Sequence, residues 1–435
     1  MFSKILIANR GEIAVRIIRA CKEMGVATVA VYSEADKDAL HVALADQSYC
    51  IGGPEASDSY LNENRIISAA ILAGAQAIHP GYGFLSENAH FSRLCRKHGL
   101  VFIGPDPERM ERLSDKAALK ELIRGTGLTV IPGTTVLADL EEARQAADAL
   151  GYPVMLKACA GGGGRGIRLI REPEELEDAW QQAAGEALSA FGDGSLYLEK
   201  YVFPARHVEL QILADEHGNA VCLGDRDCSL QRRNQKLIEE TPSPAVSEAQ
   251  RARIMALAVE AVKTLGYVGA GTLEFLLDRA GNFWFMEMNV RLQVEHCVTE
   301  MLTGIDLVKW QIRIAAGIPL GFTQEEVRLQ GAAIECRINA GCCGTLRMLH
   351  VPGGPSVRFD TCLVEGTVVS PYYDALLGKL VVHSRTREEA LRKLRAALCE
   401  LVIDGIPTNI EEQLRIIEDE RFVSGSYDLT FMGNR

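Results

Sequence analysis

The sequence predicts a multidomain protein of mixed α/β and α+β class, with a doubly wound parallel sheet at its N-terminus and a mixed domain at its C-terminus. The chain has 435 residues, too many for one hydrophobic core, and this length suggests roughly two to four domains. Its first third alternates short apolar runs with helical patterns, which is the rhythm of parallel βαβ units. Further along, two strand patterns separated by residues 279–282 predict an antiparallel pair.

The N-terminal region begins with a strand at residues 5–8, followed by a helix at residues 13–24 whose apolar side chains recur at helical spacing. Further strands of this sheet are expected at residues 27–32, 77–79 and 101–103. Open parallel sheets bind ligands beyond the carboxyl ends of their strands. Because residues 9–12 and 80–88 follow two such strands, the sequence predicts that both segments lie at a ligand-binding edge.

The middle and C-terminal regions mix both element types. Helices are expected at residues 116–127, 141–150 and 248–265, and strands at residues 129–131, 153–156, 167–170, 195–202, 207–213, 273–278 and 283–289. The last part of the chain combines short strands with one amphipathic helix, on which Leu391, Leu394, Leu398 and Leu401 share a face.

The composition excludes several classes of protein. The net charge is −12, from 46 basic and 58 acidic residues, which argues against nucleic acid as the main partner because phosphate backbones select basic surfaces. No apolar run reaches membrane-spanning length, and the first residues resemble a buried strand rather than a signal peptide. The 12 cysteines form no Cys-x-x-Cys pair, so we expect reduced thiols in a cytoplasmic protein.

A glycine-rich stretch at residues 157–166 separates two of the predicted strands. Lys157 leaves the first strand, and four successive glycines follow at residues 161–164. Glycine lets backbone N–H groups approach oxyanions without obstruction, and lysine adds a point charge. No Gly-Lys-Ser/Thr follows, so this is not a Walker loop. The stretch predicts a flap that folds over phosphates, and the alternative is a flexible surface hairpin.

Two acidic residues lie on facing strands of the predicted antiparallel pair. Glu274 and Glu287 are each flanked by large apolar residues, and an ionised carboxylate there needs a compensating charge. Asn289 lies two residues beyond Glu287 and points to the same face. These three hard oxygen donors suit Mg²⁺ bound with nucleotide phosphates, and the alternative is a pair of satisfied strand-edge acids.

A polar strip follows directly. Arg291, Gln293 and Glu295 alternate, which on an extended backbone places them on one side. Arginine offers a planar fork to a small carboxylate-like anion, glutamine can donate to that anion, and glutamate can accept its proton. The strip therefore predicts an oxyanion site beside a general base, the alternative being a solvent-facing strand. Residues 227–236 form a polar loop that would supply cations near phosphate or be solvated, and Arg337 lies within a strand-like run.

Taken in order, these motifs resemble biotin carboxylase, the ATP-grasp component of acetyl-CoA carboxylase and related biotin-dependent carboxylases. The resemblance runs from Lys4 to about Phe422. It is carried by residues 7–14, 79–88, 157–166, 226–229, 235–236 and 291–296. Other ATP-grasp ligases share the flap and the metal acids but lack the first two and the last of these motifs.

The resemblance implies an N-terminal biotin carboxylase domain at residues 1–115, an ATP-grasp region at residues 116–330 and a C-terminal biotin carboxylase domain at residues 331–435. It also implies a mobile lid at about residues 130–202, which would close over ATP through the glycine flap. Closure of this kind excludes water from a hydrolysable intermediate.

The family also implies a role for each matching residue. ATP, as a substrate, would contact Lys116, Lys157, Gly163, Gly164, His207, Gln231, Asn234, Glu274 and Glu287, with Glu199, Lys200, Tyr201 and Val202 holding the adenine. Mg²⁺ or Mn²⁺ would be bound by Glu274, Glu287 and Asn289. Bicarbonate would be held by Lys236, Arg291, Gln293, Val294 and Glu295. Within this set Lys236, Arg291 and Glu295 would be catalytic, with Glu295 as the base, and Arg337 would bind biotin and stabilise its enolate-like form.

The chain departs from the family at a few positions. Residues 341–349 are shorter than the family's acidic, proline-rich loop, which affects the expected biotin contacts beyond Arg337. Cys297 replaces a proline, Cys159 replaces a serine, and Asn234 stands where some relatives have histidine. None of these changes removes a proposed catalytic group.

Partners follow from the same resemblance. The sequence contains no Met-Lys-Met attachment site and no carboxyltransferase domain, so we expect biotin on a separate carrier protein and carboxyltransferase on other subunits. A homodimer is expected through a segment carrying Arg16, Arg19 and Glu23 and through residues 372–374. The expected overall enzyme is acetyl-CoA carboxylase of fatty acid synthesis. The alternatives are another ATP-grasp carboxylate–amine ligase and a nucleotide-binding regulatory relative without turnover.

Overall fold

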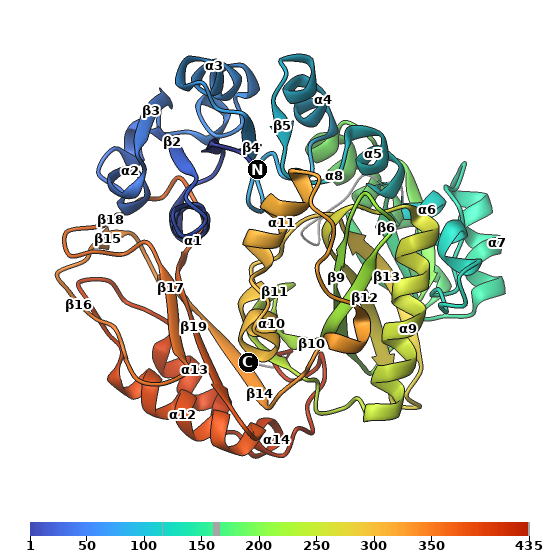
Figure 1. Ribbon diagram of the computed structural model, residues 1–435. Coiled ribbons are helices and arrows are strands. Elements are labelled where there is room, and N and C mark those ends of the chain that lie inside the picture. Colours follow the sequence, from blue (N-terminus) through green and yellow to red (C-terminus); the bar gives the residue numbers. More distant parts are fainter. Residues whose placement is uncertain (115, 160–165, 434–435) are drawn as a thin grey trace.

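The computed structural model describes residues 1–114, 116–159 and 166–433. Two sheets dominate the ribbon in Figure 1: a small one in the N-terminal domain and a long one that runs from the middle of the chain into its C-terminal part. A third, three-stranded sheet forms a separate unit. Gly163 and Gly164 of the predicted flap lie outside the described residues.

The N-terminal sheet has the strand order β3-β2-β1-β4-β5, and every neighbouring pair is parallel. The strands are β1 (Lys4–Ile7), β2 (Ala27–Ser33), β3 (Gln47–Gly52), β4 (Ala77–His79) and β5 (Val101–Phe102). Ile5 and Ile7 pack in one cluster with α1 (Gly11–Glu23), whereas Leu6 packs in another with α3 (Glu63–Ala73). Both faces of β1 are therefore buried, which confirms the predicted doubly wound sheet.

Four more helices complete this part of the chain and lead into the next. They are α2 (Leu40–Leu44), α4 (Ala89–Lys97), α5 (Pro107–Ser114) and α6 (Lys116–Arg124). Short 3₁₀ turns lie at Glu34–Asp36 and Ala56–Asp58 here, and at Pro173–Glu175 and Gln324–Glu326 further along.

The segment expected to be a lid forms its own small unit. Strands β6 (Val154–Ala158), β7 (Ile167–Ile170) and β8 (Leu196–Lys200) make an antiparallel sheet in the order β7-β6-β8. Helices α7 (Leu140–Leu150) and α8 (Leu176–Phe191) accompany it, and a hydrophobic cluster confined to this segment holds it together. Figure 1 shows α7 at the outer edge of the molecule.

The long sheet has eight strands in the order β13-β12-β9-β10-β11-β14-β19-β17, and all its neighbouring pairs are antiparallel. Its strands are β9 (Ala205–Ala214), β10 (Ala220–Arg232), β11 (Gln235–Thr241), β12 (Gly269–Asp278), β13 (Phe283–Asn289), β14 (Ala332–Asn339), β17 (Val357–Thr361) and β19 (Leu376–Ser384). The pairing of β11 with β14 crosses the predicted boundary at residue 331, so the middle and C-terminal regions share one sheet.

Helices cover this sheet and finish the C-terminal region. Helix α9 (Glu248–Leu265) packs on β9 and β10, and α12 (Arg387–Glu400) packs on β14 and β19. The other helices are α10 (His296–Thr303), α11 (Leu307–Ala315), α13 (Ile410–Ile417) and α14 (Glu420–Val423). The remaining short strands are β15 (Gly344–Thr345), β16 (Met348–His350), β18 (Val368–Val369) and β20 (Val402–Asp404).

The strand predicted at residues 129–131 is wrong. Val130 makes a single isolated bridge to Phe285 at the edge of the long sheet, and Gly133 then bridges to Glu199 in the small sheet. Pro132, which has no backbone N–H to donate, lies between the two bridges. The segment is thus a linker that passes from the edge of the long sheet to the small sheet. It pairs first with β13 and then with β8, and it forms a regular strand in neither sheet.

None of the helices in the described ranges is both long enough and apolar enough to cross a bilayer.

Because His41 is buried, we expect the free energy of unfolding to depend on pH. Burial lowers the pKa of His41 from 6.5 to about 4, although nearby Asp36 opposes the shift. From pH 6.5 downward toward pH 4, the unfolded chain binds a proton at this residue and the folded chain does not, so stability falls. In urea unfolding, His41→Gln should reduce the slope of unfolding free energy against pH by about 1.4 kcal/mol per pH unit.

The exposed His90 provides the matched control, His90→Gln. Equal slopes for the wild type and the His41→Gln variant across that pH window would contradict the prediction.

Candidate active site

A cleft of about 730 Å³ lies between the N-terminal domain, the middle of the long sheet and the start of β19. Most of the residues singled out in the sequence line it: His207, Gln231, Asn234, Lys236, Glu274, Glu287, Asn289, Arg291, Gln293, Val294, Glu295 and Arg337. The N-terminal domain contributes Tyr82 and Glu87 from the segment after β4. The other predicted edge segment supports the cleft from behind, because Asn9 Nδ2 donates to the carbonyls of Pro80 at 2.7 Å and Tyr82 at 2.8 Å.

Lys236 lies at the centre of the cleft. Its Nζ donates to Glu209 Oε2 at 2.7 Å, forms a close ion pair with Glu295 and lies 3.6 Å from Glu274 Oε1. Arg337 approaches Glu295 from the neighbouring strand, with its guanidinium 2.9 Å from Oε2. Glu295 is therefore held between two cations carried by β11 and β14.

These cations control the ionisation of Glu295. Burial by itself raises the pKa of a carboxyl group, but Lys236 and Arg337 outweigh burial and hold the pKa of Glu295 well below its ordinary value. In this arrangement Glu295 is ionised, and its charge is balanced by ion pairs with the two cations. The basicity of Glu295 would rise where another anion takes over part of its contact with Lys236.

Arg226 of β10 forms the floor beneath these groups and has no exposed surface. It donates to Glu209 Oε1 at 2.6 Å, to Gln211 Oε1 at 2.6 Å and to Gln293 Oε1 at 2.7 Å. A buried guanidinium needs this many acceptors because each unpaired N–H would cost free energy. The result is that β9, β10 and the segment after β13 are fixed relative to one another.

The two acids of the predicted metal site face each other. Glu274 on β12 is paired directly with Glu287 on β13 in the strand register. Glu274 Oε1 accepts from Asn289 at 2.7 Å and from Gln293 at 2.8 Å, and its Oε2 lies 3.0 Å from His207 Nε2. Two carboxylates opposite each other with a carboxamide beside them form a hard-oxygen donor set that fits Mg²⁺.

His207 responds to the same acid. Burial lowers the pKa of an imidazole, but the adjacent Glu274 outweighs it and raises the pKa of His207 above 6.5. Gln231 Nε2 lies 2.7 Å from the other ring nitrogen of His207. Glu274 thus favours the protonated form of His207, and a protonated imidazole on the wall of the cleft suits contact with a phosphate.

The strip at residues 291–295 is not an extended strand, which corrects that expectation. Between β13 and α10 the backbone has no regular secondary structure. The side chains of Arg291, Gln293 and Glu295 contact different partners, which an extended strand with all three on one side would not allow. Arg291 Nε donates to Glu87 at 2.9 Å, Gln293 is buried between Arg226 and Glu274, and Glu295 meets Lys236. The three groups still line one cleft, so their convergence is confirmed while its backbone basis is different.

A tight hairpin aligns two further groups. Arg233 and Asn234 connect β10 to β11, both with positive φ, of 50° and 63°. Such a two-residue turn places Gln231 directly opposite Lys236 in the register. Asparagine tolerates the left-handed conformation, which accounts for Asn234 at this position.

The residues expected around the adenine form a separate cluster on the small sheet. Glu199 of β8 is buried between Lys157 and Lys120, and its Oε2 accepts from Lys157 Nζ at 2.5 Å. Lys200 Nζ donates to the carbonyl of Gly151 at 2.5 Å. Tyr201 and Val202 follow β8 as extended chain, and Lys116 begins α6. This cluster is not part of the described lining of the cleft.

Several groups at the site were missed in the sequence. Glu209 holds both Arg226 and Lys236, and Glu239 accepts from Arg337 Nε at 2.6 Å. Lys379, also fully buried, donates to the carbonyl of Val294 at 2.9 Å. The signal for Glu209 was present, since it alternates with His207 and Gln211 along a strand whose every residue here is buried.

Family models match nearly the whole chain. The biotin carboxylase N-terminal domain matches residues 1–110, the ATP-binding domain of the carbamoyl-phosphate synthase L chain matches residues 115–323, and the biotin carboxylase C-terminal domain matches residues 335–434.

Full-length relatives agree with these models. A biotin carboxylase of Nostoc sp. is 51% identical, covering 99% of this chain and 98% of that protein. The 2-oxoglutarate carboxylase small subunit of Hydrogenobacter thermophilus is 49% identical, covering 99% and 93%. A crystal structure of the latter's biotin carboxylase domain dimer, in complex with MgADP, ADP and bicarbonate, superposes with a TM-score of 0.97 at 48% identity, covering 100% of this chain and 97% of that one. The cleft, the folds and the matches together show that the chain belongs to the biotin carboxylase family of ATP-dependent ligases.

Proposed function

We propose that this chain carboxylates the biotin of a carrier protein, using ATP and bicarbonate by way of carboxyphosphate. The observation that carries the proposal is the position of Glu295 between Lys236 and Arg337 at the centre of the cleft. A base between two cations can bind an oxyanion, take its proton and then expose a cation to a second substrate. The alternative ligase, which would activate an organic acid, has no need of a base here.

ATP is proposed to lie between the small sheet and the long one. Lys116, Lys157, His207, Gln231 and Asn234, with the flap glycines, are assigned to its phosphates. Glu199, Lys200, Tyr201 and Val202 are assigned to the adenine. Because the Lys200 side chain is engaged with the Gly151 carbonyl, the backbone after β8 is the part of that segment offered to the base.

Glu274, Glu287 and Asn289 are proposed to hold Mg²⁺ or Mn²⁺, which neutralises the triphosphate and favours attack at the γ-phosphorus. The crystal structure of the Hydrogenobacter domain carries MgADP, which supports this assignment. In the protein alone, Asn289 and Gln293 hold Glu274 in place by donating to it. These donors orient the carboxylate before the substrate arrives.

Bicarbonate is proposed to bind Lys236, Arg291, Gln293 and Val294. Once bicarbonate shares Lys236, the cation no longer lowers the pKa of Glu295 so strongly, and Glu295 can take the bicarbonate proton. The deprotonated oxygen then attacks the γ-phosphorus of ATP, ADP leaves, and carboxyphosphate forms. Carboxyphosphate divides into CO₂ and phosphate next to the second substrate.

Biotin is proposed to bind at Arg337. The released phosphate takes the proton from biotin N1′, negative charge develops on the ureido oxygen, and N1′ attacks CO₂. Arg337 stabilises that oxygen because a guanidinium remains charged throughout. Glu239, which accepts from Arg337 Nε, fixes the direction in which the guanidinium faces.

The location of the enzyme, its partner proteins and the final acceptor of the carboxyl group are also proposals. We infer a cytoplasmic enzyme that acts on a separate biotinyl carrier and supplies carboxyltransferase subunits. Acetyl-CoA is the proposed final acceptor; the similarity to a 2-oxoglutarate carboxylase subunit makes an oxo acid the second candidate. Assays of the complete complex with acetyl-CoA and with 2-oxoglutarate distinguish the two. The domain limits 1–115, 116–330 and 331–435 and closure of the lid at residues 130–202 stay predictions.

The metal acids should act on turnover and not on folding. Glu287→Gln should reduce bicarbonate-dependent ATP cleavage by roughly 10²-fold or more, because a neutral amide binds a divalent cation weakly. Activity is measured at saturating ATP and Mg²⁺, and the melting temperature checks the fold. The exposed Glu365 supplies the control Glu365→Gln. Wild-type turnover in the Glu287 variant would remove it from the metal site.

Substitutions at Glu295 and at Arg337 should affect the two half-reactions differently. Arg337→Ala should abolish most carboxybiotin formation while ADP release continues, since removing one cation from Glu295 leaves its base function intact. Glu295→Ala should abolish both. ADP and carboxybiotin are measured in parallel, with the exposed Arg253→Ala as control. If Arg337→Ala, still folded and still binding ATP, lost both activities equally, the assignment of Arg337 to biotin alone would be wrong.

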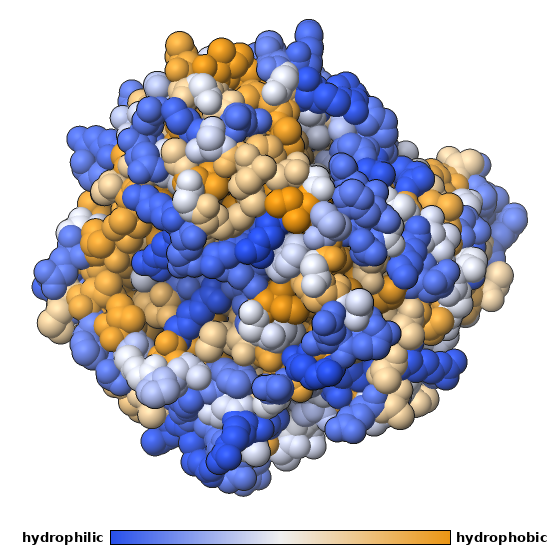
Figure 2. All heavy atoms as spheres, in the orientation of Figure 1, coloured by the Kyte–Doolittle hydropathy of each residue, from blue (hydrophilic) through white to orange (hydrophobic). Residues whose placement is uncertain are grey.

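A homodimer is proposed through the face that carries α1. Figure 2 shows hydrophilic side chains gathered to the left of the centre of this view, where Figure 1 places α1. Arg16 is engaged within the chain with Glu300 and Asp306, and Glu23 with Lys309, whereas Arg19 is exposed. Light scattering at micromolar concentration should give twice the mass of one chain, and Arg19→Glu should lower it. A monomer for the wild type refutes the dimer.

A further inference from the structure

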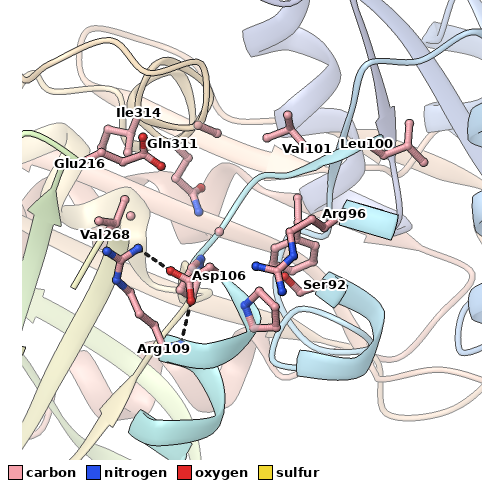
Figure 3. A pocket seen from close by; sticks show the side chains of 16 residues that line it. Ser92, Arg96, Leu100, Val101, Asp106, Arg109, Glu216, Val268, Gln311 and Ile314 are labelled. Carbon is pink, nitrogen blue, oxygen red and sulfur yellow. Dashed lines mark hydrogen bonds and ion pairs between the residues drawn. The ribbon is translucent and has the colours of Figure 1, made fainter. Parts of the chain in front are cut away.

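A second cavity, of about 250 Å³, lies away from the active-site cleft (Figure 3). It is enclosed by α4, β5 and the start of α5 on the N-terminal side, and by α11 and the start of β12 on the other. No described residue lines both this cavity and the cleft. Its position between two regions of the chain is typical of small-molecule sites.

One polar side chain in the wall is buried and unsatisfied. Gln311 of α11 is 5% exposed, and its Oε1 has no hydrogen-bond donor among the residues that the structure describes. Figure 3 shows this side chain reaching from α11 toward the space that faces Asp106 and Arg96. A buried carbonyl oxygen without a donor costs free energy, so a group that donates to Gln311 Oε1 would be bound favourably.

The two arginines that line the cavity are already paired, and the exposed Glu216 adds a carboxylate to the wall that has no ion-pair partner among the described residues. The Arg109 guanidinium pairs with Asp106, whose Oδ1 also accepts from the Arg109 backbone at 2.8 Å. Arg96 makes a two-pronged pair with Glu108, at 2.6 and 3.0 Å. An anion would have to separate one of these pairs and would meet the Glu216 carboxylate, whereas a neutral ligand would do neither. The wall therefore selects against anions.

Much of the rest of the wall is apolar. Leu100, Phe102, Val268 and Ile314 are all buried and line the cavity. Gly269, with φ of 116°, brings its backbone against the Gly104–Pro105 peptide, where an added Cβ would lie 4.0 Å from that backbone. An apolar wall of this kind suits a ring that lies against it.

We propose that this cavity is a binding site for a small neutral ring with an amide or ureide edge, that is, a lactam or a cyclic ureide. An adjacent N–H and C=O on the ligand would pair with the Gln311 carboxamide through two hydrogen bonds. The last side-chain torsion of glutamine is broad and roughly two-fold, so the carboxamide can present either edge. The ring would lie against the apolar wall, and the cavity holds about one ring of this size.

The test uses 2-pyridone as the probe and the full-length protein. Saturation-transfer NMR and a titration should give binding with a dissociation constant on the order of 1 mM, as expected for so small a ligand. N-methyl-2-pyridone, which lacks the N–H, should bind at least about tenfold more weakly. Gln311→Leu, which keeps the volume and removes the carboxamide, should weaken 2-pyridone to the same extent, a loss of about 1.4 kcal/mol.

Two further variants keep the result interpretable. Ala315→Phe fills the cavity from the end of α11 and should abolish binding even where Gln311→Leu folds poorly. Gln47→Leu, at an exposed glutamine of β3, should bind like the wild type. ATP cleavage should remain unchanged in all three. Absence of saturation transfer in the wild type, or equal binding by Gln311→Leu or by the N-methyl probe, would overturn the proposal and leave the cavity to water.

Discussion

The Arg226 guanidinium is the contact on which the catalytic geometry depends. It has no exposed surface and joins Glu209 and Gln211 of β9, Thr272 of β12 and Gln293 before α10. Removing one partner of such a buried pair costs about 3–5 kcal/mol, because the other charge is then left uncompensated. Strands that are distant in sequence are thereby held in a fixed relation, and Glu209 passes that constraint on to Lys236.

The ionic balance of the cleft follows from this constraint. Lys236 and Arg337 have carboxylate partners in the protein alone, and both partners of each pair are buried or nearly so. An anion that binds at Lys236 or Arg337 would therefore exchange one set of charge-assisted bonds for another. In the proposed reaction this exchange would couple bicarbonate binding to the basicity of Glu295, because each bond that the anion takes from Lys236 would weaken the ion pair between Lys236 and Glu295.

Much of the fold could be predicted from the sequence, namely those helices and strands whose position depends on a local sequence pattern. Periodicity and a serine cap delimit α9, which begins and ends where residues 248–265 were expected, and a short turn specifies the β12–β13 hairpin. The prediction failed where contacts with distant parts of the chain determine the backbone conformation, as at residues 129–131, which join two sheets. Glu209 and Lys379 also escaped detection. The alternation of Glu209 with His207 and Gln211 shows which side of the strand it lies on but not that it pairs with Lys236, and Lys379 has no neighbour in sequence that reveals its function.

The continuous long sheet also determines how the protein can be divided. Lys236 on β11 and Arg337 on β14 are carried by neighbouring strands, so a ladder with a spacing of about 4.8 Å sets the separation of the groups proposed for the two half-reactions. The C-terminal segment is consequently not a detachable module. A fragment ending before β14 would expose the backbone edge of β11 beside a stripped apolar surface, which is a template for strand pairing between molecules. The middle and C-terminal regions should therefore fold, and be expressed, only as one unit.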